Sequence, residues 1–232
     1  MKNIQTIIVA CTLMLMSMST SVISDSSNFA GPYIGLQGST IGAGVAGRQS
    51  GGVDAVNEST TVDAGKTGVA AGYEAGYAIP IGSMFLLDIG GTFIDGAVSL
   101  RSGGTDTGSS EDVKFVVSDF YSLYAAPTLV LSDTSSLYVK YASSQASVDV
   151  TGDITDPGNL QGTTIAVGTR TVLDSGIFIR AEAGMTDYNA ITSNGKGTIV
   201  STTGTPGGIS TTKSFNADAD MAFGAVSLGF RF

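Results

Sequence analysis

The stretch VAAGYEAGYAI, at residues 69–79, shows the pattern that decides the fold. Val69, Tyr73 and Tyr77 fall on one face of an extended chain, while the opposite face holds only Ala, Gly and the single carboxylate Glu74. Successive side chains of a β-strand point to opposite faces. A period of two therefore predicts a strand with one apolar face and one face of small residues.

The same alternation recurs along the chain, and the C-terminal stretch repeats it clearly. There Ala222, Gly224 and four larger apolar residues share a face, opposite Ala225, Ser227, Gly229 and Arg231. In all, the sequence predicts eight strands, at residues 33–41, 69–79, 85–93, 113–131, 137–148, 165–173, 177–185 and 222–232.

The connections between these strands are of two kinds. Three are short and rich in Gly, Pro, Asp and Ser, which favour tight turns: residues 80–83, 132–135 and 174–176. Four are long and polar: residues 42–65, 101–112, 151–162 and 190–216. Short and long connections alternate, so we expect an antiparallel up-and-down meander with both termini at the short-turn end and no internal domain boundary.

Two of the strands are irregular. Asp119 interrupts the apolar face of residues 113–131, so we expect it to lie above the apolar band or beside a β-bulge. In residues 137–148, Ser143 and Gln145 share the face of Leu137 and Tyr141, which makes this strand the least regular of the eight.

The placement of charge favours a membrane barrel over a soluble ligand carrier or a β-sandwich. A soluble barrel would point charged side chains outward, whereas here the face opposite the apolar one carries isolated charges among Gly, Ala and Ser. In lipid, strands satisfy every backbone group only by closing into a barrel, and about 9–11 residues suffice to cross. We therefore predict an all-β, eight-stranded antiparallel up-and-down transmembrane β-barrel, with a lumen charge network of Glu74, Asp88, Lys140, Arg170, Arg180, Glu182 and Arg231.

Within this network, three acids face four bases, and we interpret Glu182 with Arg180, and Glu74 with Asp88, as lumen ion pairs rather than catalytic carboxylates. The aromatic residues predict two interfacial girdles of the barrel. The girdle near the short-turn ends would contain Tyr77, Phe85, Phe230 and Phe232, and the girdle near the loop ends Phe93, Tyr141 and Tyr188.

The N-terminal residues read as a targeting segment. Lys2 precedes an apolar stretch that ends in small residues before Asp25, and this order is typical of a secretory signal peptide. We expect a signal peptide at residues 1–24, cleaved after Ser24, and a barrel at residues 25–232. Cys11 is the only cysteine of the chain, so the processed protein would have no thiol.

Composition excludes several functions. The chain has no histidine, which removes Ser-His-Asp and Cys-His nucleophile systems and the commonest general base. The net charge of −9 argues against nucleic-acid binding. We expect no enzyme activity, no cofactor and no metal site. The acidic loop residues are interpreted as a solvated surface, with weak divalent-cation bridging to lipopolysaccharide as the alternative.

Both ends of the predicted barrel resemble a known family. Residues 29–38, FAGPYIGLQG, resemble the opening strand of opacity-type, OmpA-like small outer-membrane barrels. The final GFRF, residues 229–232, resembles their closing strand, with Val226, Leu228, Phe230 and Phe232 as the C-terminal signal that barrel-assembly machinery recognises. The resemblance implies a Gram-negative outer membrane, periplasmic turns, surface loops, contact with lipopolysaccharide and no catalysis. The chain stops at Phe232, where full OmpA proteins append a peptidoglycan-binding domain.

These observations favour a monomeric structural or surface-interaction protein of adhesin-like type, which presents four polar loops. A small pore of low or gated conductance is one alternative, although eight strands leave only enough interior for side chains. A soluble periplasmic carrier is the other alternative.

Overall fold

The structure is a computed structural model that describes residues 25–50, 59–101, 114–151, 158–194 and 214–232. Its elements are two short 3₁₀ segments, η1 (Ser26–Asn28) and η2 (Asp174–Gly176), and nine strands: β1 (Gly31–Ser50), β2 (Ser59–Pro80), β3 (Phe85–Arg101), β4 (Lys114–Val130), β5 (Ser135–Thr151), β6 (Leu160–Val172), β7 (Ile177–Tyr188), β8 (Ile191–Asn194) and β9 (Ser214–Arg231). Among the described residues, no helix is both long enough and apolar enough to span a bilayer.

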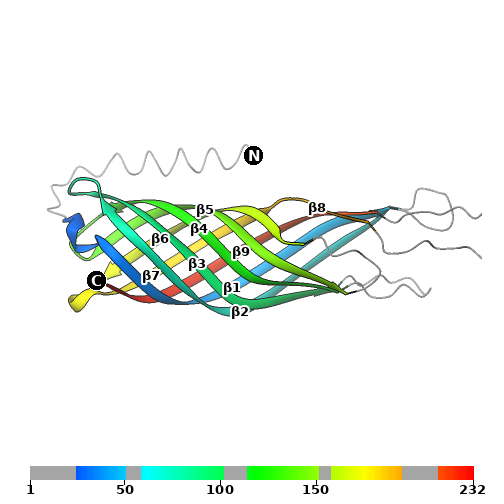
Figure 1. The fold of residues 1–232 in the computed structure, drawn as a ribbon, viewed down its shortest axis with the longest axis horizontal. Helices are drawn as coiled ribbons and strands as arrows, with labels where there is room; N and C mark the ends of the chain where they lie inside the picture. Colours follow the sequence, from blue (N-terminus) through cyan, green and yellow to red (C-terminus); the bar gives the residue numbers. More distant parts are fainter. Residues whose placement is uncertain (1–24, 51–58, 102–113, 152–157, 195–213) are drawn as a thin grey trace, which may run out of the picture.

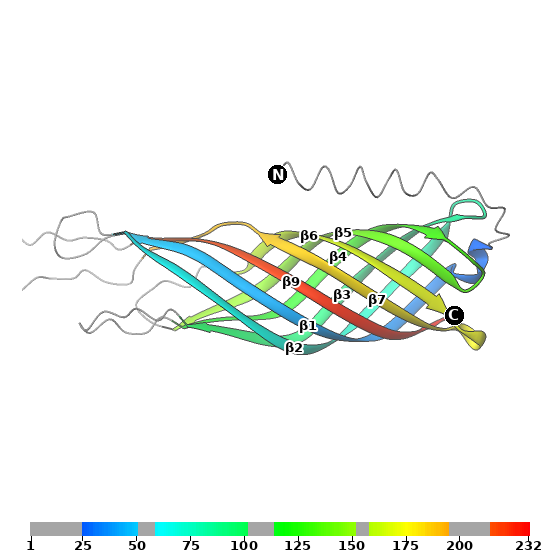
Figure 2. The same cartoon turned by 180° about the vertical axis from the view of Figure 1, so that it is seen from behind.

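The strands form one closed antiparallel barrel. Each strand from β1 to β7 pairs with the next, and β9 pairs with β1 to close the sheet. Strands β7 and β8 pair with successive lengths of β9, so together they fill one position around the barrel. The predicted eight-stranded up-and-down barrel is confirmed, and its strands tilt strongly against the long axis (Figures 1 and 2).

Both described ends of the chain lie at the end that carries the short turns (Figure 1). The turns between β2 and β3 and between β6 and β7 each contain a glycine with positive φ: Gly82 at 78° and Gly176 at 83°. Residues with a side chain rarely adopt a positive φ, which explains why glycine occupies both positions.

One of the four predicted loops is mostly strand in the structure. Pairing of β1 with β2 continues to Ser50 and Ser59, so most of the expected loop at 42–65 is strand. Strands also take up the ends of two other predicted loops, at residues 160–162 and at residues 191–194 and 214–216. The expectation failed because it required large apolar residues on the outward face, whereas Ile41 and Val45 point inward here.

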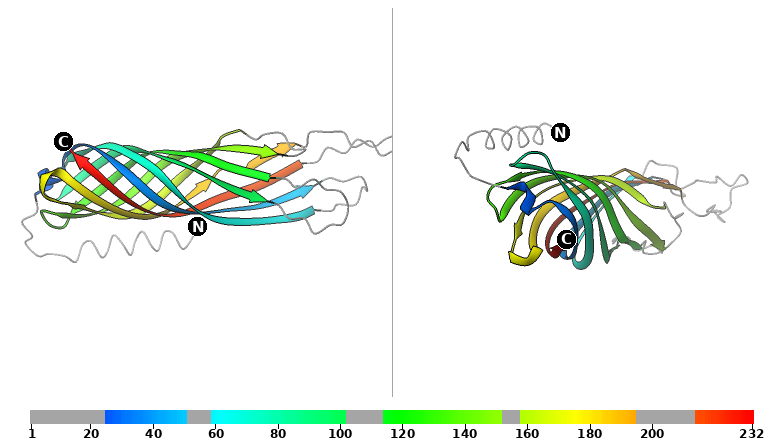
Figure 3. Two further views of the ribbon diagram at one scale, coloured as in Figure 1. Left: turned by 90° about the horizontal axis from the view of Figure 1, so that it is seen from below. Right: turned by 60° about the vertical axis from the view of Figure 1, so that its left-hand side comes forward.

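The strands do not stay in one closed sheet along their whole length. Pairing between β2 and β3 stops at Ala71 and Asp95, whereas β1 and β2 remain paired far beyond that point. Toward the long-loop end, the barrel therefore separates into two sheets, one with β8, β9, β1 and β2 and the other with β3, β4 and β5 (Figures 2 and 3).

A bulge in β4 accounts for the position of Asp119. The register with β5 shifts between Ser118 and Tyr121, and Asp119 adopts a positive φ of 52°. The shift leaves the Asp119 side chain exposed. The predicted β-bulge is confirmed, and it changes which residues of β4 face inward on either side of it.

Candidate functional site

The outer wall of the barrel is apolar over the half of the strands nearest the short turns. Leu36, Leu123 and Val226 are 66%, 71% and 59% exposed, although they are large and hydrophobic. Such a surface suits hydrocarbon and not water. We call this half the membrane band.

The aromatic residues bound this band, with one exception to the prediction. Tyr77, Phe85, Phe230 and Phe232 are exposed near the short turns, and Phe93 and Tyr141 near the other boundary. Tyr188 was expected in the outer girdle but is buried, because its ring points into the lumen and packs against the apolar cluster there.

Arg180 of β7 organises the charges inside the membrane band. Its Nη1 lies 2.9 Å from Oε2 of Glu74 on β2, and its Nη2 lies 2.6 Å from Oδ2 of Asp88 on β3. One guanidinium thus pairs with two carboxylates from two strands on the far side of the lumen. Arg170 of β6 approaches the same Oδ2 of Asp88 with its Nη1 at 3.6 Å.

A second ion pair lies beside this cluster. Lys140 of β5 places Nζ 2.6 Å from Oε1 of Glu182 on β7, and the Tyr138 hydroxyl donates to the other oxygen of that carboxylate at 2.8 Å. Three carboxylates therefore meet three cations, so the described charged layer is neutral overall. Buried charge without such compensation would be strongly unfavourable.

Two sequence-based pairings need correction. Glu182 pairs with Lys140 and not with Arg180, and Glu74 and Asp88 do not pair with each other but share Arg180. Arg231 does not join the charged layer either. Its Nη1 donates to the carbonyl oxygens of Ser27 and Ala30 at the short-turn mouth. The other six residues of the expected network all point into the lumen.

Three tyrosines that the sequence analysis did not single out complete the charged layer. The Tyr33 hydroxyl donates to Oδ1 of Asp88 at 2.5 Å, and Nη1 of Arg180 donates to the Tyr124 hydroxyl at 3.1 Å. The Arg180 guanidinium also lies 5.0 Å from the ring centre of Tyr138, within the range of a cation–π interaction.

The small residues of the lumen face make room for these rings. Five of the inward rings stand directly opposite a glycine of the neighbouring strand, and a Cβ on that glycine would overlap the ring. The pairs are Tyr33 with Gly76, Tyr124 with Gly90, Tyr138 with Gly168, Phe178 with Gly229 and Tyr188 with Gly162. These tyrosines could have been identified from the sequence by one signal. Each is an inward-facing ring, and the position that pairs with it on an adjacent strand is an inward-facing glycine.

Apolar side chains fill the lumen on both sides of the charged layer. Toward the short turns, Phe29, Leu86, Val130 and Phe178 form one buried cluster, which we call the lower apolar cluster. Toward the long loops, a larger cluster, the upper apolar cluster, includes Ile41, Val98 and Phe120. A cavity of about 30 Å³ between the charged layer and this larger cluster has room for about one water molecule. The described lumen is thus packed and does not form an open channel.

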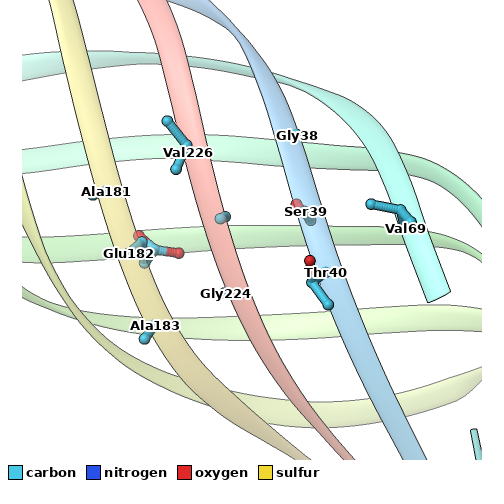
Figure 4. A pocket seen from close by; sticks show the side chains of 10 residues that line it. Gly38, Ser39, Thr40, Val69, Ala181, Glu182, Ala183, Gly224 and Val226 are labelled. Atoms are coloured by element: carbon cyan, nitrogen blue, oxygen red, sulfur yellow. The ribbon is translucent and has the colours of Figure 1, made fainter. Parts of the chain in front are cut away.

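A shallow hollow marks the outer wall where β7, β9 and β1 run side by side. Figure 4 shows its small outward residues, among them Gly38, Ala181, Ala183 and Gly224. Glu182 also contributes to the hollow's lining, but its side chain belongs to the lumen ion pair described above. The outward residues of this hollow carry no charge, and the Thr40 hydroxyl is the one polar side-chain group among them.

The described residues contain no group of three or more His, Cys, Asp or Glu side chains placed to hold a metal ion. The buried carboxylates are instead committed to Arg180, Arg170 and Lys140. The arrangement of the lumen is that of a neutral, hydrogen-bonded core, and nothing in it provides positive support for catalysis.

Comparison with known proteins places the fold. Neither a family model nor a curated protein matches the sequence. Among solved structures, the chain is similar to outer membrane protein OprG from Pseudomonas aeruginosa, with a TM-score of 0.57 at 12% identity, over 91% of this chain and 99% of that one.

Two further structures have lower TM-scores. The outer membrane protease OmpT from Escherichia coli gives 0.49 at 8% identity, covering 87% and 97% of the two chains. Ail, the attachment invasion locus protein of Yersinia pestis, gives 0.30 at 12% identity, covering 82% and 98%. At such identities the likeness concerns the fold alone, and that fold is the small antiparallel β-barrel of outer-membrane proteins.

Proposed function

We propose that this protein is an anchor in the outer membrane of a Gram-negative cell that holds a surface-interaction region, adhesin-like in type, outside the lipid. The observation that supports this most is the length and polarity of the strands. β1 has 20 residues and β2 has 22, about twice the 9–11 needed to cross a bilayer.

The part of the strands beyond the membrane band has the polarity of a water-soluble domain. We call it the outer extension: residues 41–50, 59–68, 94–101, 114–120, 144–151 and 214–223. Its apolar residues, such as Val45 and Val98, are buried inside, and its exposed positions carry Asp95, Asp149 and Asp220. A region built in this way would be stable in water and would lift the long loops away from the membrane surface.

The packed lumen supports an anchor rather than a pore. An ion that crossed the barrel would have to displace the lower apolar cluster, the charged layer and the upper apolar cluster in turn. Eight strands leave an interior just wide enough for side chains to fill, and here side chains do fill it. The exposed apolar wall likewise argues against a soluble carrier.

The same proposal includes how the chain would be exported and inserted into the outer membrane. Residues 1–24 would direct export, and the C-terminal residues Val226, Leu228, Phe230 and Phe232 would be recognised by barrel-assembly machinery. The short turns would then face the periplasm and the outer extension would pass among lipopolysaccharide molecules, with the protein as a monomer. Val226, Leu228 and Phe230 are exposed on the outer wall, where an assembly factor could contact them.

Site-directed labelling on intact cells tests the location and orientation. With Cys11→Ser as background, a cysteine at Ala46 in the outer extension should react with a membrane-impermeant maleimide on intact cells. A cysteine at Thr134, in a short turn, should react only after the outer membrane is permeabilised. Both positions are exposed, so accessibility of the side chain itself does not bias the comparison. The reverse pattern would contradict the proposed orientation.

Two measurements test the role. In planar bilayers, the refolded protein should give no stable single-channel steps, and regular steps would favour the pore. Bacteria that export the protein should be retained on a host-cell or abiotic surface better than bacteria exporting a variant with short turns in place of residues 51–58 and 195–213. Equal retention, with both proteins shifting on heating in a detergent gel, would remove the adhesin-like role.

A further inference from the structure

The N-terminal residues of the described chain lie across the mouth of the barrel at the short-turn end (Figure 1). Phe29 is completely buried there, and its ring packs with Tyr33, Leu86 and Val130, which point inward from β1, β3 and β4. A side chain that precedes the first strand thus belongs to the core of the lumen. Neither the alternating pattern of the strands nor the charged layer requires Phe29 to be buried in the lumen.

Polar contacts hold the same residues to two of the short turns. The backbone N–H of Ser26 donates to the carbonyl of Ser83 at 2.9 Å, and its hydroxyl donates to the carbonyl of Gly82 at 2.6 Å. The backbone N–H of Asp25 and the side-chain amide of Asn28 both donate to Asp133, in the turn between β4 and β5. The segment therefore bridges two neighbouring short turns.

The last strand supplies the third attachment. Nη1 of Arg231 donates to the carbonyl oxygens of Ala30 at 3.0 Å and Ser27 at 3.4 Å. This explains why Arg231 stands apart from the lumen carboxylates. Its guanidinium binds the carbonyl oxygen of Ser27 within η1 and that of Ala30 just beyond it.

Gly31 lets the chain turn from the mouth into β1. Its φ of 109° is a conformation that residues with a side chain rarely adopt, and a Cβ there would lie 3.0 Å from the carbonyl oxygen of Phe232. Gly38, seven residues later in the same strand, has neither restriction, since nothing lies within 4 Å of its Cβ position. The two glycines therefore form a matched pair for substitution.

We propose that residues 25–30 are a built-in stopper that closes the short-turn mouth of the lumen, and that Gly31 sets its closed position. The stopper shields the lower apolar cluster from water by placing Phe29 over it, and it is held by groups from two turns and β9. Its release would open the lower cluster while the charged layer above stays closed. This goes beyond the proposed function, because the stopper would act in the same way whatever the outer extension contacts.

Thiol labelling in detergent micelles tests the stopper directly. Cys11→Ser removes the only native thiol, and Val130→Cys then places a nearly isosteric reporter behind Phe29. A charged methanethiosulfonate should react slowly with this reporter in the parent protein. In Gly31→Ala, and separately in Phe29→Ala, the rate should rise about tenfold or more, which corresponds to about 1.4 kcal/mol less closing free energy.

Three controls keep the result specific. Gly38→Ala should leave the Val130→Cys rate unchanged. A reporter at Ala126, buried beside Tyr124 and Tyr138, should stay protected in every variant. A reporter at the exposed Ser83 should react rapidly in all of them. Phe29→Ala keeps the test valid if Gly31→Ala does not fold, as judged by heat-modifiability.

Several outcomes would overturn the proposal. One is a Val130→Cys rate in the parent that equals that of Ser83→Cys, because the mouth would then be open already. Another is an unchanged Val130→Cys rate in the folded variants. A third is equal acceleration of Val130→Cys and Ala126→Cys, since that would show general loosening of the barrel and not release of a local segment.

Discussion

The membrane band and the outer extension are built from the same strands but have opposite polarity. In β1, Leu36 points out toward lipid, whereas Ile41, five residues further along, points into the lumen. In β3, the adjacent residues Phe93 and Ile94 belong to the outward wall of the band and the inward core of the extension. Along the same strands, the lumen-facing residues are charged and hydrogen-bonded in the membrane band and apolar in the outer extension.

This difference shows that the surrounding medium decides what each face can be. In hydrocarbon the outer wall must be apolar, so the sequence can place charge only inside, where every ion needs a partner. In water the outer wall can be polar, and burying apolar side chains inside becomes the main source of stability. The point at which the polarity reverses along each strand therefore marks the level of the membrane surface.

The largest expected effect comes from removing Arg180, the central cation of the membrane band. Arg180→Met would leave Glu74 and Asp88 as buried carboxylates with much less compensation, and it should destabilise the barrel by about 3–5 kcal/mol. Equilibrium urea unfolding in phospholipid vesicles measures this loss. Adding Glu74→Gln and Asp88→Asn should recover a large part of it. If the triple variant were less stable than Arg180→Met alone, the cost would not come from unpaired charge.

The second test addresses the core of the extension. Ile41 is 1% exposed, so Ile41→Ala should cost about 2–5 kcal/mol through lost burial and the cavity left behind. Thr40→Ala, at the neighbouring outward position, should change the unfolding free energy by about 0.5 kcal/mol or less. The same urea experiment compares the two variants. A larger loss at Thr40 than at Ile41 would show that the reversal of polarity occurs elsewhere on β1.

The sequence predicted the membrane band well for a physical reason. Alternation reports directly which side of a strand each residue occupies, so six lumen charges could be named without any knowledge of the fold. The partners of these charges could not be named in the same way. Arg180 meets Glu74 and Asp88 across the lumen from strands far away in the chain, and these meetings depend on the stagger of all the strands between them.

The sequence predicts most of the β4 and β5 parts of the outer extension but not the β1 and β2 parts, where the large apolar residues face inward rather than outward. Residues 41–47 do alternate, with Ile41, Ala43 and Val45 at every second position, but Gly and Ala between them resemble a loop composition. Phe29 was missed for a different reason. No periodicity covers a residue that precedes the first strand, and only the three-dimensional position of Gly31 brings its ring into the lumen.

A third test places one cation on the outer wall of each region. Leu228→Arg, in the membrane band, should destabilise the folded barrel in vesicles by about 2–4 kcal/mol if its level is near the bilayer centre. Ala46→Arg, on the exposed wall of the extension, should change stability by about 0.5 kcal/mol or less. Similar costs at the two positions, measured by urea unfolding in the same vesicles, would mean that lipid covers both regions.

A fourth test concerns how the band accommodates its rings. Gly168→Ala would place a methyl group against the Tyr138 ring and the carbonyl of Ala181, and overpacking of this kind costs about 1–3 kcal/mol. Gly38→Ala, in the same band but on the open outer wall, is the matched control and should be close to neutral. Equal unfolding free energies for the two variants would show that Gly168 is not needed to make space for the Tyr138 ring.

The smallest expected effect lies at the mouth, outside both regions, where water reaches the stopper. The backbone N–H of Ser27 donates to the Asp25 carboxylate, which lowers the pKa of Asp25 below its ordinary value of 3.8. A lowered pKa means that this contact contributes above pH 3.8 and is lost as the pH falls through the folded value.

The chain has no tryptophan, so Phe29→Trp provides a single fluorescent reporter at the mouth. Its emission should stay constant from pH 7 to about 4 and shift to the red below that range, as protonated Asp25 weakens the closed position. Asp133 and Arg231 are the other charged groups that contact the segment, so the shift should persist in Asp133→Asn and weaken in Asp25→Ala. An identical acid response in Asp25→Ala would assign the response to another carboxylate. The position of the stopper would then depend on a titrating group of the barrel and not on Asp25.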